Sequence, residues 1–89
     1  LAHDKDHFGA RKNLGLLLLR LDRVDPAREH LTEALEVRPA DPELRKALAE
    51  IARRAGDPTT CTTHLDAVLR QQADDRSARE LLEKCATPD

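Results

Sequence analysis

Hydrophobic positions along the chain fall into five segments, which short polar breaks separate. The breaks contain Asp-Pro at 25–26, 41–42 and 57–58, and an Asp can cap a helix whose first residue is Pro. Asp74 and Asp75 offer the same cap without the proline. Leucine, alanine, arginine and glutamate dominate, and the scarcity of β-branched and aromatic residues nearly excludes a β-sheet protein. The pattern predicts five helices, over residues 8–21, 26–38, 42–55, 58–72 and 76–86.

The hydrophobic pattern repeats after 34 residues, and polar positions repeat with it. The superposed sets are Leu14, Leu48 and Leu82; Leu17, Ile51 and Cys85; Arg11, Arg45 and Arg79; and His30 with His64. A fixed period that carries both kinds of match indicates a repeat architecture. The predicted connections are only three or four residues long, so sequential helices should pack antiparallel. The repeating unit is therefore expected to be a helix hairpin.

Small residues mark the points where the two helices of each hairpin should cross. Gly15 and Ala49 occupy equivalent places on the first helices, with Ala27 and Cys61 as their expected partners. Glu83 occupies the third equivalent place. A charged side chain is tolerated there only if no further helix packs against it, so the last helix is expected to be a cap. We expect two core layers, one made of Leu14, Leu17, Leu31 and Leu35, the other of Leu48, Ile51, Leu65 and Leu69.

The motif Asn13-Leu14-Gly15, followed by Ala27 and Pro39, has the spacing of a known family. The chain resembles the tetratricopeptide repeat, with leucine or arginine at the places where the family has aromatic residues. The resemblance implies an all-α, right-handed solenoid of antiparallel helix hairpins, with about two full repeats and a capping helix. The expected parts are a tail of a preceding repeat helix or a linker over 1–7, repeats over 8–41 and 42–75, and a capping helix and tail over 76–89.

Charge and length exclude two classes of partner. The 89 residues hold 15 Lys and Arg against 17 Asp and Glu, for a net charge of −2. Nucleic-acid binding needs a basic surface, which this balance does not supply. The longest apolar run, Leu14–Leu19, is far shorter than the ~20 residues of a membrane span. We therefore expect neither a nucleic-acid partner nor membrane insertion.

Two cysteines and a histidine suggest a metal or redox site, but structural roles fit them better. Cys61 and His64 lie one helical turn apart, and Cys85 recurs in the next helix. These three form no closed set of four ligands, and two cysteines do not make a disulfide scaffold. We expect both cysteines to be free, buried as small hydrophobic residues. Free thiols in the core favour a cytoplasmic setting.

Other candidate chemistry is sparse. The segment His3-Asp-Lys-Asp-His7 could hold a metal at a frayed end, but without a second ligand cluster it is expected to be a solvated turn between helices. The chain has no Ser/His/Asp set, no paired-carboxylate pocket and no glycine-rich phosphate loop. We expect neither an enzyme nor a bound cofactor.

The family resemblance implies that the first helices of successive repeats line a concave groove for a partner peptide. Leu16 and Leu19 would anchor apolar side chains there, and Asn13 would bond the peptide backbone. Carried over to this sequence, the groove residues are Lys12, Asn13, Leu16, Leu19, Arg20, Lys46, Glu50, Arg53 and Arg54. The main hypothesis is a non-enzymatic scaffold for protein–protein interaction. The alternative is a structural cap of a longer repeat array or a self-association module, with a weak homodimer through the apolar N-terminal face.

Overall fold

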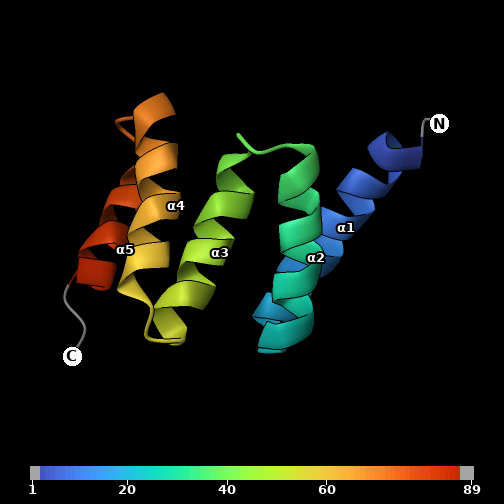
Figure 1. Ribbon diagram of the computed structural model, residues 1–89, viewed down its shortest axis with the longest axis horizontal. Coiled ribbons are helices and arrows are strands. Elements are labelled where there is room, and N and C mark those ends of the chain that lie inside the picture. The colour runs from blue at the N-terminus through green and yellow to red at the C-terminus, as the bar shows by residue number, and fades with distance from the viewer. Residues whose placement is uncertain (1–2, 87–89) are drawn as a thin grey trace.

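The computed structural model describes residues 3–86 and builds them from five helices. These are α1 (His3–Arg20), α2 (Val24–Val37), α3 (Pro42–Arg54), α4 (Pro58–Gln71) and α5 (Arg76–Ala86). Successive helices run antiparallel and stand in chain order across the molecule, with α3 between α2 and α4 (Figure 1). The described residues contain no strand. The predicted all-α fold of helix hairpins is confirmed, whereas the hand of the solenoid stays a prediction.

Aspartates begin three of the helices as the sequence predicts. Asp41, Asp57 and Asp75 each accept a hydrogen bond from the backbone N–H three residues further on, at 3.1, 3.1 and 3.0 Å. Prolines follow the first two of these caps. Each cap satisfies a backbone donor of the first helical turn, which has no partner within the helix. Local chemistry therefore fixes where α3, α4 and α5 start.

The start of α2 differs from its prediction. The helix begins at Val24, its N-cap residue is Arg23, and no side chain caps it. The preceding Asp22 has a positive φ of 64°, and the Arg23 N–H donates to Leu18 O at 2.8 Å. This tight turn starts the helix early, so Asp25 lies inside the first turn and accepts a bond from Arg28 instead.

Helix α1 also starts earlier than predicted, at His3. The prediction of a solvated turn over residues 3–7 is therefore wrong, because this segment continues the helix. The first two residues of the expected N-terminal tail lie outside the described part of the chain. The division into repeats at 8–41 and 42–75 stays a prediction.

The core forms two clusters that share α3. The first contains Phe8, Ala27, Leu31, Ala34, Leu44, Ala47, Leu48 and Ile51; the second contains Ala49, Ala52, Cys61, Leu65, Val68, Ala78 and Cys85. Opposite faces of α3 thus join the two hairpins. The predicted first layer is wrong in part, because Leu14 and Leu17 are 41% and 45% exposed. Leu16 and Leu19, predicted to line the groove, are partly buried and pack against the first cluster. Their place in a groove stays a prediction.

Gly15 lies at the crossing of α1 and α2, as its small size predicts. A Cβ atom at this position would stand 2.7 Å from Cγ of Leu31, closer than van der Waals contact permits. Leu31 is fully buried, and close packing around it opposes its displacement. The residue that the glycine accommodates is therefore Leu31 rather than the smaller Ala27.

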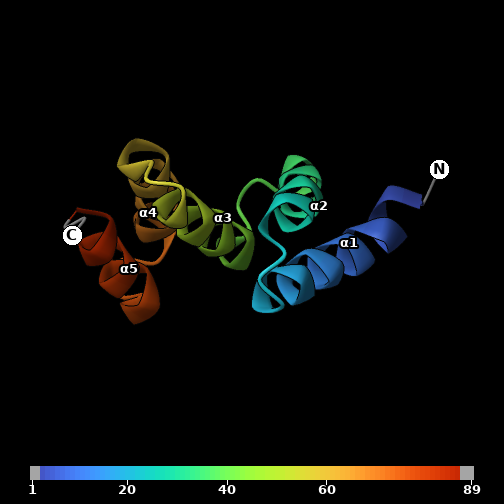
Figure 2. The ribbon, with the colours of Figure 1, turned by 90° about the horizontal axis from the view of Figure 1, so that it is seen from below.

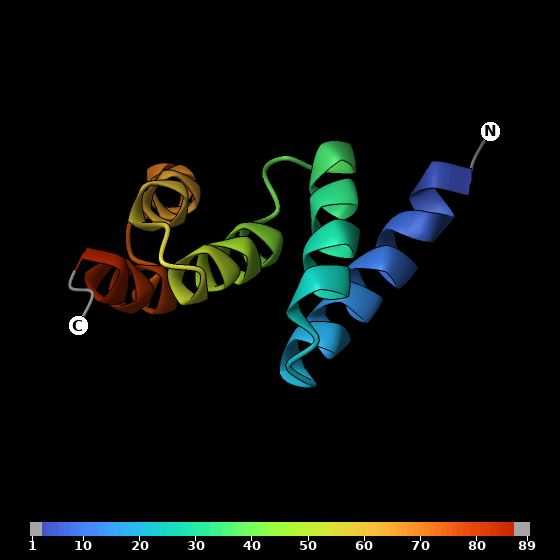
Figure 3. The ribbon, with the colours of Figure 1, turned by 60° about the horizontal axis from the view of Figure 1, so that its bottom comes forward.

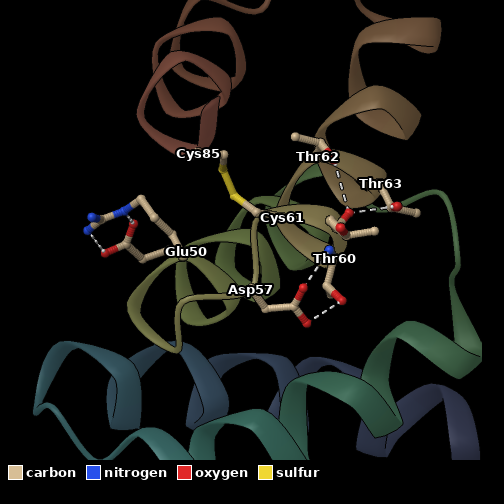
Figure 4. The surroundings of a disulfide bond; sticks show 9 residues. Glu50, Asp57, Thr60, Cys61, Thr62, Thr63 and Cys85 are labelled. Carbon is tan, nitrogen blue, oxygen red and sulfur yellow. Dashed lines mark hydrogen bonds and ion pairs between the residues drawn. A yellow bond between two sulfur atoms is a disulfide. The ribbon is translucent and has the colours of Figure 1, made fainter. Parts of the chain in front are cut away.

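The prediction of free cysteines is wrong. Cys61 of α4 and Cys85 of α5 are joined by a disulfide, and their Cα atoms lie 6.1 Å apart (Figure 4). The 34-residue repeat explains their meeting. The residues equivalent to them, Ala27 and Ile51, are both buried in the first core cluster. Equivalent packing of α4 against α5 brings the two cysteines together, and the bond ties the last helix to the fold.

Candidate peptide-binding face

Ion pairs link the first helix of one hairpin to the first helix of the next. Lys12 of α1 lies 2.8 Å from Asp41 and 2.7 Å from Glu43, both at the start of α3. Burial acts to lower the pKa of Lys12, but the bonds to these two carboxylates outweigh it and raise that pKa above its ordinary value. Burial likewise opposes the charge of Asp41, yet Lys12 and the Leu44 N–H hold its pKa below the usual range. Lys12 is thus already occupied.

The same arrangement recurs one repeat later. Lys46 of α3 lies 3.0 Å from Asp75 and donates to Ser77 Oγ, also at 3.0 Å, at the start of α5. The Ala78 N–H, Lys46 and Ser77 together lower the pKa of Asp75 to about 2. Each of these aspartates therefore caps a helix and also receives a lysine from the first helix of the preceding hairpin. Within the described chain, these pairs hold α1, α3 and α5 together.

A third group of paired charges lies at the C-terminal end of α3. Glu50 receives two bonds from Arg53, at 3.0 and 2.8 Å, and one from Arg54 at 2.8 Å. The bonds from Arg53, then those from Arg54, lower the pKa of Glu50 against the opposing effect of burial. Arg54 also reaches Asp22, at 3.1 Å, in the turn after α1. Most of the cations predicted to serve a partner are therefore engaged within the chain.

Two predicted groove residues remain open on α1. Asn13 and Arg20 are exposed, and neither has a hydrogen bond or ion pair within residues 3–86. Leu16 lies between them at helical spacing, so the three side chains share one face of the helix. Leu16 and Leu19 keep part of their surface accessible. These residues form what we call the open strip of α1: Asn13, Leu16, Leu19 and Arg20.

The motifs of the sequence did not predict the acidic partners of Lys12 and Lys46. Lys12 precedes Asp41 by 29 residues, and Lys46 precedes Asp75 by the same interval. Both pairs share the 34-residue period, and this was the signal that could have revealed them. Among the described residues, no group of three or more His, Cys, Asp or Glu side chains could hold a metal ion. None of the helices in that part is long and apolar enough to span a bilayer.

The antiparallel helices and the ion pairs that recur with the hydrophobic period define a helical-repeat protein. Residues 27–85, more than half of the chain, match the family model described as tetratricopeptide repeat. The chain belongs to the tetratricopeptide repeat family, as its sequence motifs predict. Membership indicates a protein–protein interaction module, and the family is in general not enzymatic. Comparison with curated proteins and with solved structures gave no match.

Proposed function

We propose that the chain binds a partner peptide along the face formed by α1, α3 and α5, with the open strip of α1 as the primary contact. The observation that supports this is the difference between the strip and its surroundings. Asn13 and Arg20 have unused hydrogen-bonding capacity within the described residues, whereas the lysines beside them are paired. Protein interfaces combine an apolar centre with a polar rim, and the strip offers both.

Each residue of the strip has a distinct role in this proposal. The accessible edges of Leu16 and Leu19 receive an apolar side chain of the peptide. The Asn13 amide bonds the peptide backbone, and Arg20 attracts a carboxylate. Lys12, Lys46 and Glu50 form a rigid floor beside the strip, because their ion pairs already fix their positions. The peptide is therefore expected to combine an apolar anchor with acidic residues.

Selection from a random peptide library displayed on phage tests the proposal. Recovered peptides should share a large apolar residue next to Asp or Glu. Arg20→Glu should weaken their binding about tenfold at low salt, since rim charges act through screened electrostatics. Asn13→Ala should weaken it less. Arg70→Glu, an exposed change on α4, is the matched control and should have no effect.

Two results would contradict the peptide-binding proposal. In one, Arg70→Glu abolishes binding while Arg20→Glu does not, which would place the site on the second helices. In the other, no peptide is selected and sedimentation shows a dimer that buries Leu16 and Leu19. That outcome would favour the structural or self-association role.

A further inference from the structure

The side of α1 that faces away from the rest of the molecule carries leucines that no neighbouring helix covers. Leu14, Leu17 and Leu21 are 41%, 45% and 59% exposed. Together with the exposed Ala10 they follow a helical stripe, which we call the α1 outer face. Figures 2 and 3 show α1 as the outermost helix at one end of the molecule, with α2 packed on one side of it.

The internal repeat shows what normally covers this stripe. A shift of 34 residues superposes Ala10, Leu14 and Leu17 on three residues of α3, namely Leu44, Leu48 and Ile51. Those three are 0%, 7% and 2% exposed, and they lie in one core cluster with residues of α2. In the second hairpin, therefore, the equivalent stripe is covered by a helix.

The residues of α2 that face the second hairpin indicate the chemistry of a helix that would fit such a stripe. A hollow of about 400 Å³ between α2 and the second hairpin is lined on the α2 side by Arg28, Thr32 and Leu35. Their spacing places a cation, a hydroxyl and a leucine on one side of the helix. Across the hollow lies His64, whose Nδ1 is 3.3 Å from Arg45.

The equivalent histidine of the first hairpin lacks such a contact. The buried Nδ1 of His30 has no hydrogen-bond partner among the described residues. Arg11, which corresponds to Arg45, pairs with Glu33 at 3.3 Å instead. His30 lines a hollow of about 240 Å³ together with Ala10 and Leu14 of the outer face. A buried polar atom without a partner is unfavourable, so this hollow has both an apolar and a polar contact to offer.

We propose that the α1 outer face binds an amphipathic helix of a partner protein, whose contacting side resembles that of α2. A leucine of that helix packs between Leu14 and Leu17, and a hydroxyl or cationic side chain reaches His30. A second copy of the chain fits less well, because the matching side of its own α2 already faces its second hairpin. This surface adjoins the open strip along α1, since Leu17 is four residues from Asn13, but the proposal does not depend on peptide binding at the strip.

A peptide with the sequence of residues 24–38 is the probe. A covalent bridge between side chains 29 and 33 holds it helical, because both positions are exposed on α2 and a free helix of this length is marginally stable. Fluorescence polarisation of the labelled peptide against the full chain should show saturable binding. The same peptide with Leu35→Asp is the control and should lose that binding.

Variants of the protein test the location of the site. Leu17→Asp should weaken peptide binding at least tenfold, because it places a charge in the apolar contact. Ala73→Asp, an exposed change in the turn after α4, should leave binding unchanged. Circular dichroism checks that each variant is folded. If Leu17→Asp is not, Leu21→Asp at the more exposed end of the stripe takes its place.

Isotope-edited NMR then maps the contact. The proposal expects peptide-induced shifts at Leu14, at Leu17 and at the His30 ring. Shifts confined to Leu48 and Ile51 would mean that the peptide replaces α2, and would overturn the proposal. Absence of saturable binding up to about 1 mM would overturn it as well. So would sedimentation showing that the chain dimerises and that Leu17→Asp abolishes the dimer, because the occupant would then be a second copy.

Discussion

Lys12 and Asp41 form an ion pair that joins α1 to the start of α3, with Nζ 2.8 Å from a carboxylate oxygen. Lys46 and Asp75 repeat this pair at 3.0 Å, 34 residues further along the chain. Each aspartate also caps a helix. One carboxylate thus stabilises the start of a helix and also the contact of that helix with the first helix of the preceding hairpin.

Replacement of Asp75 should therefore lower the stability of the fold. Asp75→Ala removes a cap and should lower the free energy of unfolding by about 1 kcal/mol, with a further loss from the unpaired Lys46. Asp74→Ala is the matched control, because Asp74 is exposed and has no partner among the described residues. Urea denaturation measures both. Equal losses for the two variants would show that the cap and ion pair of Asp75 contribute nothing beyond the loss of an aspartate in this turn.

The charge of Asp75 also predicts how stability depends on pH. Its pKa is about 2 in the fold against 3.8 for an ordinary aspartate. A lowered pKa means that the unfolded chain binds the proton more readily, so this stabilisation is present above about pH 4 and is lost as the pH falls toward 2. Asp75→Asn keeps a side chain that can cap and should flatten this part of the pH profile. An NMR titration midpoint of Asp75 near 3.8 would contradict the prediction.

Two glycines of α1 should respond in opposite ways to alanine. At Gly15 the new methyl group would meet Leu31 at 2.7 Å, and overpacking of this kind costs ~1–3 kcal/mol. The gain in helix propensity of ~1 kcal/mol offsets only part of it. At Gly9 nothing lies within 4 Å, so alanine should stabilise the helix by up to ~1 kcal/mol. Thermal melts of the two variants should shift in opposite directions, and Gly15→Leu should melt lower still. A higher melting temperature for Gly15→Ala would place Gly15 away from a tight crossing.

Local signals in the sequence predict that the helices exist better than they predict the residue at which each helix begins. Asp41 and Asp57 cap as expected because the cap depends only on a few neighbouring residues. Asp25 does not, because the left-handed turn at Asp22 starts α2 before the aspartate is reached. A positive φ is uncommon outside glycine, and although aspartate adopts it more often than most residues, the sequence does not single out Asp22 among the aspartates.

The repeat period predicts which positions are equivalent, but not which neighbours each position meets. Leu14 and Leu48 are equivalent, yet only Leu48 has a helix in front of it. The same limit applies to the site. Lys12 has the charge of a ligand-binding residue, but its partner Asp41 becomes visible only when α1 and α3 are placed together. Whether two cysteines on different helices form a disulfide likewise depends on which helices are in contact, and composition does not reveal this.

Reduction of the disulfide should weaken the fold. Cys61 and Cys85 are 24 residues apart, and closing a loop of this length stabilises a protein by about 3 kcal/mol. Reductant should therefore lower the melting temperature of the wild-type chain. The double variant Cys61→Ala with Cys85→Val should melt at the lower temperature and should not respond to reductant. A wild-type melt that is insensitive to reductant, with two thiols titrating in the native protein, would contradict the bond.

His64 and Arg45 provide a second, milder dependence on pH. A guanidinium only donates hydrogen bonds, so the Nδ1 of His64, 3.3 Å from Arg45, must be the acceptor, and the ring is neutral with its proton on Nε2. Burial, and then the charge of Arg45, lowers the pKa of His64 below 6.5. Protonation places a hydrogen on the nitrogen that faces the arginine and removes the bond.

This lowered pKa determines the direction in which stability changes with pH. The unfolded chain takes up the proton first, so stability should be constant above about pH 6.5 and should decline as the pH falls below it. His64→Gln should remove this decline. NMR titration of Arg45→Gln should give a higher His64 midpoint than the wild type, but one still below 6.5, because burial of the ring remains. If the midpoint does not move, the arginine has no electrostatic influence on the ring, and the contact between the two side chains is only one of packing.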